Sequence, residues 1–532
     1  MNIRKSAGAL LIPLALGTAG LGAIDCHAAS TKPNFINIIL DDLGFSDLGA
    51  FGSEIPTPHL DQLANDGIIM TNFYAAPTST PGRGMLFAGK SSHASGVGIM
   101  ASMAPEGEQI DKPEYEGRLS LNALPFPELL QQNGYYTMFT GKWDLSEIST
   151  VPLTNNPPEE FSDGADLAAQ TAYLADYETY LTKYAEYFTE HQPQVVAPKL
   201  PKEPTEAGLQ AQYDNLLSTY NTLEEEYSAI AVPDMAAHDP YSRGFSVTKA
   251  ALILGGANNY STATAPYIPW ELFTKAVTNS DWLYTENGEG IPNFPEEFYS
   301  TNYYTKSAKE MLSDWSQNES SQPFYLCVSY TAPHNPLQAP ADVTAKYIDT
   351  YSRGWEDIRK ERFKKQLELG FWPGKDLTDL PPIPGRTWAS VPEGTDVLIK
   401  RPDGASPENY RPDEATPGNT YGGKQYSAKE MAVYAAMIEI LDLRIGELID
   451  HLKEIGAYEN TLIMIHGDNG AASQVYGNVD SAKKSYDDIG NRDSYTSLDA
   501  EWAITSNTPF SNMKVSQHEG GWHTAAIIHY PK

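Results

Sequence analysis

The sequence predicts an α/β fold, in which a central, mostly parallel sheet is sandwiched by helices. The first observation is a set of continuous apolar runs at 35–40, 135–139, 324–330 and 461–465. Strands of a parallel sheet look like this because helices cover both faces of the sheet. The second observation is that helical segments alternate with these runs. The longest, 427–455, carries one apolar stripe and begins with a Ser-x-x-Glu capping pattern.

Each apolar run ends in a polar cluster. The clusters, in chain order, are Asp41-Asp42, Gly141-Lys142-Trp143, Thr331-Ala332-Pro333-His334 and His466-Gly467-Asp468-Asn469-Gly470. In open α/β sheets, ligands bind beyond the carboxyl ends of the strands. We therefore expect these clusters to meet in one functional site.

Composition excludes one broad class of function. The chain has 69 acidic and 37 basic residues and a formal net charge of -32. Phosphate contacts require surfaces of Lys and Arg, so a nucleic-acid-binding role is not expected. With 532 residues, of which 41% are hydrophobic, the chain can bury a substantial core.

The N-terminus resembles a cleaved secretion signal. Arg4 and Lys5 precede an apolar run at 7–24, and small residues follow at 28–29. We expect residues 1–29 to be removed, which predicts a periplasmic or secreted protein with no membrane span in the mature chain. Removal takes Cys26 away and leaves Cys327, so the mature chain cannot form an internal disulfide. Cys327 lies in an apolar run and is expected in the core rather than as a nucleophile.

Two stretches are predicted to interrupt the α/β unit, whose parts are 33–160 and 233–532. Residues 161–232 are expected to form an antiparallel helical hairpin with a heptad seam. The seam comprises Leu167, Leu174, Leu181 and Phe188 in one arm and Leu209, Leu216, Leu223 and Ile230 in the other, with tyrosines between them. Its role is open among self-packing, a partner surface and a lid. Residues 351–423, rich in Pro, Gly and charge, are expected to form a long surface excursion.

Two of the polar clusters supply metal ligands of one chemical type. Asp41, Asp42, Asp468 and Asn469 offer hard oxygen atoms. Such ligands favour Ca²⁺ or Mg²⁺ over Zn²⁺. Each pair alone is also an ordinary turn or helix-cap sequence, so the expectation depends on the two pairs meeting.

A further motif is more specific. Ser79-x-Pro81-x-Arg83-x-x-Leu86-x-x-Gly89 resembles the signature of the formylglycine-dependent sulfatases of the alkaline phosphatase superfamily, in its serine-type version. The other sulfatase landmarks follow in the expected order. They are the two metal-ligand pairs, Gly141-Lys142-Trp143, the His334 segment, and Lys514 with Glu519-Gly520-Gly521. Segments 243–245, 284–288 and 298–301 resemble bacterial periplasmic arylsulfatases in particular.

The resemblance implies a site and a reaction. Ser79 would be oxidised to 3-oxoalanine (formylglycine) by a serine-type maturation enzyme. Its hydrated form would attack the sulfur of a small sulfate ester beside one divalent cation, most simply Ca²⁺. The implied ligands are Asp41, Asp42, Ser79, Asp468 and Asn469. The remaining implied roles are diol orientation by Arg83, sulfate binding by Lys142, His334 and Lys514, and protonation of the leaving oxygen by His334.

Three positions depart from the family pattern. Asp144 stands where the family commonly has His, a residue that helps to deprotonate the diol; Asp144 either replaces this base or slows turnover. His523 stands where Arg is usual, and Gly82 replaces a common Ser, Thr or Ala.

Two alternatives to an arylsulfatase remain at this stage. One is a phosphatase or phosphodiesterase of the same superfamily that uses unmodified Ser79, and the other is a sulfated-ligand binder that has lost turnover. The sequence leaves open whether the substrate is an aryl, alkyl, steroid or carbohydrate sulfate, and which oligomer forms. The resembling proteins continue beyond a strand like 525–530, so we expect residues 233–532 to stop before a C-terminal subdomain.

Overall fold

The computed structural model describes most of the α/β unit. The described residues are 32–100, 107–109, 112–146, 165–191, 201–253, 259–260, 284–291, 294–395, 423–473, 486–492, 494 and 496–532. The expected signal peptide at 1–29 lies outside them. Within the described part, none of the helices combines the length and apolar character that a membrane crossing requires.

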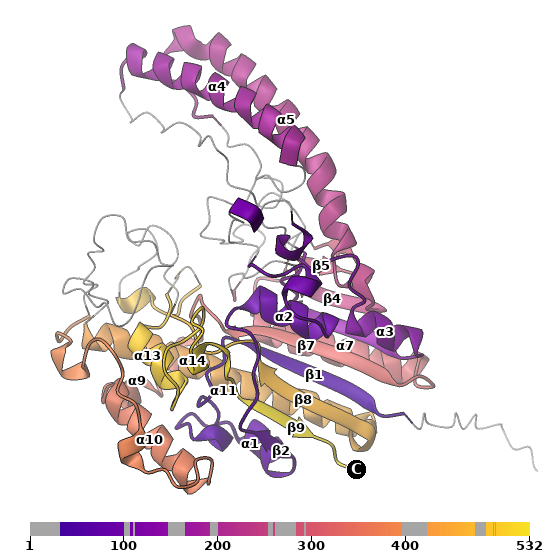
Figure 1. Ribbon diagram of the computed structural model, residues 1–532, viewed down its shortest axis with the longest axis vertical. Helices are drawn as coiled ribbons and strands as arrows, with labels where there is room; N and C mark the ends of the chain where they lie inside the picture. The colour runs from indigo at the N-terminus through magenta and orange to yellow at the C-terminus, as the bar shows by residue number, and fades with distance from the viewer. Residues whose placement is uncertain are drawn as a thin grey trace, which may run out of the picture.

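Within the described residues, a nine-stranded sheet forms the centre of the molecule, in the order β2-β9-β8-β1-β7-β3-β4-β5-β6 (Figure 1). Its middle is parallel and comprises β8 (Thr461–Gly467), β1 (Asn34–Asp41), β7 (Phe324–Pro333), β3 (Tyr136–Lys142) and β4 (Val247–Leu252). The edges are antiparallel and comprise β2 (Ile68–Met70), β9 (Ala526–His529), β5 (Tyr284–Glu286) and β6 (Glu289–Gly290). The four apolar runs are thus β1, β3, β7 and β8, as predicted.

Both faces of the sheet are buried. Ile36, Ile38 and Leu40 of β1 belong to a core cluster that includes side chains of α7 (Ser300–Asn318) and α11 (Lys424–Glu454). Alternate residues of the central strands belong to a second cluster on the other face. It includes Ile39, Cys327 and Phe87, the last from α2 (Ser79–Ala88). The predicted helix–sheet–helix sandwich is therefore confirmed, and Cys327 is a core residue whose pKa burial raises to about 12.

Apart from the helical hairpin, the other helices of the described part lie around this sandwich. They are α1 (Pro58–Asn65), α3 (Phe126–Gln132), α8 (Ala341–Thr344), α9 (Ile348–Tyr351), α10 (Trp355–Glu368), α13 (Ala500–Ser506) and α14 (Glu519–Trp522). Helix α11 begins three residues before the predicted Ser427, and its N-cap is Gly423. The predicted capping box at Ser427 is wrong, because the Ser427 hydroxyl donates a 2.6 Å hydrogen bond to Asp499 instead.

The helical hairpin projects away from the sheet (Figure 1). It consists of α4 (Leu167–His191) and α5 (Gln210–Ala237), which pack side by side around their own cluster of leucines and tyrosines. Leu167, the first predicted seam residue, is 53% exposed, so the described seam starts later, near Leu174. The side chains of Phe188, Tyr227 and Ile230 lie outside the described ones.

The predicted surface excursion at 351–423 is wrong in its first part. Helix α10 buries Trp355, Ile358 and Phe363 against the core. The many charged residues of this segment suggested that it is exposed. However, Arg359 is buried and donates to a backbone carbonyl oxygen, and Arg362 is buried and donates to a carboxylate oxygen. Residues 396–422 lie outside the described part of the chain.

Candidate active site

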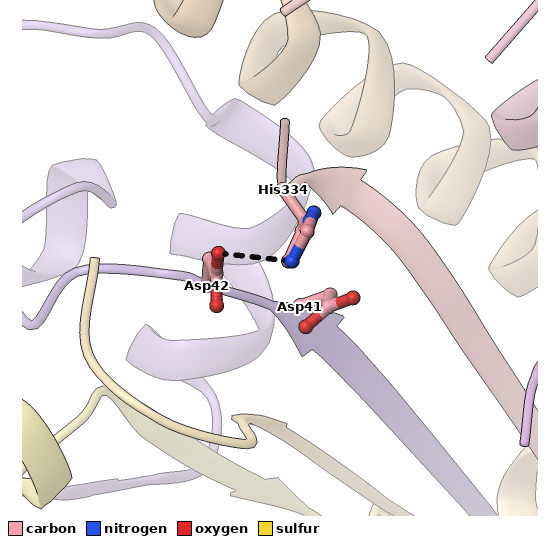
Figure 2. Close-up of side chains that lie close together, drawn as sticks. All are labelled: Asp41, Asp42 and His334. Carbon is pink, nitrogen blue, oxygen red and sulfur yellow. Dashed lines mark ion pairs between the residues drawn. The ribbon is translucent and has the colours of Figure 1, made fainter. Parts of the chain in front are cut away.

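The carboxyl ends of four neighbouring strands bring the predicted site residues together. Asp41 ends β1, Lys142 ends β3, His334 follows β7, and Asp468 and Asn469 follow β8. Because β8, β1, β7 and β3 are adjacent and parallel, these ends share one edge of the sheet. Figure 2 shows Asp41, Asp42 and His334 gathered at this edge.

A backbone turn places two consecutive carboxylates in the same pocket. Successive side chains of an extended strand point to opposite faces. Asp42 has a φ of 61°, and the register of β1 against β7 shifts between Leu40 and Asp41. The left-handed conformation turns the chain, so that ligand atoms of Asp41, Asp42 and His334 all lie within 4.8 Å of one another. Both carboxylates are buried.

Ser79 lies between the two metal-ligand pairs. It is the first residue of α2, and its Oγ is 3.1 Å from Asp41 Oδ1 and 3.0 Å from Asn469 Oδ1. The unsatisfied N–H groups of a helix start give the position a partial positive charge, which favours an anion. Pro81 is tolerated here because the first helical turn makes no intrahelical bond through its N–H groups.

Arg83, one turn further along α2, joins the helix to three strands. Its Nε donates to Asp468 Oδ2 at 3.0 Å. Its Nη1 donates to the Lys142 carbonyl oxygen at 2.7 Å and to Ser329 Oγ at 2.6 Å. Arg83 is fully buried. Ser329 is a partner that the sequence did not reveal, because nothing in the β7 run distinguishes it from other buried positions.

Two lysines neutralise the paired carboxylates. Lys142 Nζ lies 2.6 Å from Asp41 Oδ2, and Lys514 Nζ lies 2.7 Å from Asp42 Oδ1. Burial alone would raise the pKa of each aspartate. The nearby positive charges of the lysines and His334 lower it by more, so the pKa of both carboxyls is below its usual value. The carboxylates are therefore held ionised, as metal ligands must be.

His334 presents one ring nitrogen to the site. Its Nδ1 is 2.5 Å from the Asn335 carbonyl oxygen, which can only accept, so Nδ1 carries a hydrogen. Nε2 is then directed at the site and lies 3.5 Å from Asp42 Oδ2. Burial lowers the pKa of His334, while the Asp42 charge opposes this shift.

Asp144 is buried beside the start of α2. Thr80, the neighbour of Ser79, donates a 3.2 Å hydrogen bond to Asp144 Oδ2, and Lys142 Nζ lies 3.7 Å from the same oxygen. Burial raises the pKa of Asp144, although Lys142 and Arg83 oppose the shift. Thr80 is a second partner that sequence reasoning missed, although its place beside Ser79 was a signal.

The other two departures from the family pattern have structural settings. A Cβ atom at Gly82 would meet the Asp468 carbonyl oxygen at 2.9 Å, so glycine allows α2 to approach the β8 loop closely. His523 packs between aromatic rings, with Phe510 stacked at 4.1 Å. Its two ring nitrogens lie 2.9 Å from Glu519 Oε2 and 2.8 Å from the Thr71 carbonyl oxygen, so it anchors the loop that carries Lys514.

The donor set suits a hard cation. Ser79 Oγ lies beside oxygens of Asp41 and Asn469, and Asp42 Oδ1 accepts from Asn469 Nδ2 at 2.6 Å. Asp468 Oδ1 accepts from the Asp42 N–H at 3.3 Å. Among the described residues, Asp42 Oδ2 is buried without a hydrogen-bond partner, and coordination to a cation would compensate this oxygen. Carboxylate, amide and hydroxyl oxygens are ligands of Ca²⁺ and Mg²⁺. His334 Nε2 is close enough to be a further ligand, which the sequence did not indicate.

Comparison with known proteins assigns the class. The Sulfatase family model matches residues 33–228 and 238–532. An uncharacterized sulfatase of Schizosaccharomyces pombe is 30% identical, over 96% of this chain and 72% of that protein. An arylsulfatase of Klebsiella aerogenes is 27% identical, over 100% of this chain and 86% of that protein.

Two solved structures align with most of the chain. A putative sulfatase of Bacteroides fragilis aligns at a TM-score of 0.46 and 16% identity, over 96% of this chain and 70% of that chain. Ps i-CgsB aligns at a TM-score of 0.48 and 20% identity, over 94% of this chain and 66% of that chain. On the family-model match, the chain belongs to the sulfatase family, which confirms the resemblance seen in its motifs. It is a sulfuric ester hydrolase by class.

Proposed function

We propose that this chain hydrolyses aryl sulfates to a phenol and inorganic sulfate, with 3-oxoalanine formed from Ser79 as its reactive group. The observation that carries the proposal is the position of Ser79 Oγ, 3.1 Å from Asp41 and 3.0 Å from Asn469. The arylsulfatase of Klebsiella aerogenes supports the aryl substrate class. Asp41, Asp42, Asp468 and Asn469 would hold one divalent cation, Ca²⁺ in the first place.

The chemistry is divided between the bound groups and the side chains. The 3-oxoalanine and the cation, when present, supply the oxygen nucleophile that attacks sulfur. Lys142 and Lys514 bind the sulfate oxygens, and Arg83 orients the reacting group at position 79. The side chains of Lys142, Lys514 and Arg83 are buried. Their attraction to the negative charge that develops in the transition state is therefore screened less than it would be in water.

Proton transfers fall to two groups. His334 protonates the leaving oxygen from Nε2, which faces the site because Nδ1 donates to the Asn335 carbonyl. This role requires the doubly protonated ring, whose positive charge the carboxylates of Asp42 and Asp41 favour. Asp144, next to Thr80, accepts the proton in the step that releases sulfate. In the family that second role commonly falls to His, and a buried carboxylate with a raised pKa is a stronger base than an ordinary Asp.

Mass spectrometry of the peptide that contains Ser79 tests the proposal. Chain from a host with a serine-oxidising maturation enzyme should show that peptide lighter by two hydrogens. The same sample should turn over a chromogenic aryl sulfate, and Ser79→Ala should abolish turnover. Unmodified serine in active native protein would refute the 3-oxoalanine, and faster turnover of an aryl phosphate would favour the phosphatase alternative.

We also propose that residues 1–29 direct export to the periplasm or the medium, on the strength of the charged, apolar and small-residue regions described above. N-terminal sequencing of protein recovered from the periplasm should begin just after Ala29. Protein that retains Met1 at its N-terminus would contradict this.

A further inference from the structure

The turn at Asp42 is a strained element that the metal site depends on. A non-glycine residue in the left-handed region costs about 1–3 kcal/mol and persists only where its surroundings hold it. Asp42 adopts a φ of 61° and directs its carboxylate at Lys514, His334 and Asn469. Its backbone must therefore be restrained from outside the turn.

Tyr434 of α11 supplies such a restraint. Its hydroxyl lies 3.1 Å from the Asp42 carbonyl oxygen and 2.7 Å from Asp47 Oδ2. Tyr434 is buried and Asp47 is fully buried. Both partners are acceptors, so the single phenol hydrogen is shared between them, and the hydroxyl bridges the Asp42 backbone and the carboxylate of Asp47, which also accepts from the Gly44 N–H of the same turn.

Asp47 is itself fixed by two further groups. The Gly44 N–H donates to Asp47 Oδ2 at 2.9 Å, and Arg362 Nη1 donates to Asp47 Oδ1 at 2.7 Å. Arg362 also donates two bonds of 2.8 Å to Glu54, and its guanidinium is fully buried. The phenol of Tyr434 thus connects the Asp42 backbone to a buried cluster of charged side chains that includes Arg362 of α10.

We propose that Tyr434 is a positioning residue for the metal site, which fixes the Asp42 turn and so aims the Asp42 carboxylate at the cation. The inference rests on the proposed function, because it assumes that Asp42 binds a divalent ion. Partners that orient metal ligands commonly change affinity by about 10–100-fold when they are removed. Loss of the phenol hydroxyl alone should therefore weaken metal binding and leave the fold in place.

Calorimetric titration of the full chain with Ca²⁺ tests this. Tyr434→Phe should raise the Kd for Ca²⁺ by about 10-fold or more. The matched control is Tyr284→Phe, which removes a buried hydroxyl bonded to the Tyr304 hydroxyl at 3.0 Å. We expect its Kd to stay within about twofold of the wild type, since Tyr284 has no bond to the turn, and both variants to have similar melting temperatures without metal.

The possible outcomes distinguish a failure of the Tyr434 inference from a failure of the proposed metal site. Wild-type binding with an unchanged Kd in Tyr434→Phe overturns the inference alone. A wild-type chain that binds no Ca²⁺ overturns the proposed metal site and the inference with it. If Tyr434→Phe fails to fold, Thr524→Val tests the premise that fixing the turn sets the affinity for metal, because Thr524 Oγ1 donates to the Leu43 carbonyl of the same turn at 2.9 Å. An unchanged Kd in that variant would remove this premise and overturn the inference.

Discussion

Arg83 and Asp468 form a buried ion pair in which two guanidinium nitrogens approach one carboxylate oxygen. Nε lies 3.0 Å and Nη2 lies 2.9 Å from Asp468 Oδ2. The next carboxylate, Asp41, is 3.8 Å from Nη2. Asp468 therefore has two roles: it compensates the charge of Arg83, and it is a candidate metal ligand.

Asp468→Asn should destabilise the metal-free protein strongly, because it leaves the charge of Arg83 buried and poorly compensated. Removing one partner of a buried pair costs about 3–5 kcal/mol of the free energy of unfolding. Urea denaturation in the presence of chelator measures this. The matched control is Asp450→Asn, whose carboxylate is 65% exposed and 3.0 Å from Lys453. We expect that control to cost about 0–1 kcal/mol.

Substitution of Asp468 should also remove the bound metal. Asp468→Ala should bind no cation and show no sulfatase activity, because it removes a proposed ligand and the partner of Arg83. Metal content after dialysis, measured together with turnover of an aryl sulfate, checks this. Calcium retained at full stoichiometry would contradict the proposed ligand set.

Asp144→Asn should lower kcat for an aryl sulfate by about 100-fold or more, because a carboxamide cannot accept a proton. It keeps the shape of the side chain and the bond from Thr80. Steady-state kinetics on fully modified protein measures the effect, and KM should change much less than kcat. Asp144→His, which restores the residue common in the family, should recover part of the loss. An unaltered kcat in the Asn variant would remove Asp144 from the reaction.

Asp442 predicts a pH dependence of stability. This residue of α11 accepts hydrogen bonds from Leu60 N at 2.8 Å and His59 N at 3.3 Å, at the start of α1. Burial raises its pKa from 3.8 to about 6, so the folded state favours the protonated carboxyl. The resulting stabilisation is complete below the unfolded pKa and is lost as the pH rises through about 6.

Urea unfolding of the wild type and of Asp442→Asn between about pH 4 and pH 7 checks this sign. The free energy of unfolding of the wild type, relative to the variant, should fall across that range and level off above it. Parallel profiles for the two proteins would show that Asp442 titrates alike in the folded and unfolded states.

The hairpin offers a matched pair of leucines on one helix. Leu174 is buried in the cluster between α4 and α5, whereas Leu167 is 53% exposed. Leu174→Ala should cost about 2–5 kcal/mol of hairpin stability, and Leu167→Ala much less. Hydrogen exchange of the α4 and α5 amides measures both. Because this cluster is separate from the sheet core, kcat should be unchanged in both variants; a lost activity in Leu174→Ala would indicate that the hairpin contributes to the site.

Patterns that are local in the chain allowed correct predictions. The apolar runs became β1, β3, β7 and β8, and the heptads became α4 and α5. Predictions that equated charge with exposure failed. The best example is Arg362, whose helix was expected at the surface but whose charge is compensated by Asp47 and Glu54 in the interior. Asp47 and Glu54 are about 300 positions away in the chain, and no local pattern around Arg362 indicates that they are its partners.

The sequence by itself determined which strands form and which polar residues stand at their ends, because burial on two faces and strand termination leave local patterns. It also determined the sulfatase motifs around Ser79. Only the tertiary structure decided which side chains meet: Ser79 with Asn469, Arg83 with Ser329, and Tyr434 with Asp42. These contacts join residues hundreds of positions apart, and their geometry depends on strand order and on a left-handed turn that no local pattern specifies.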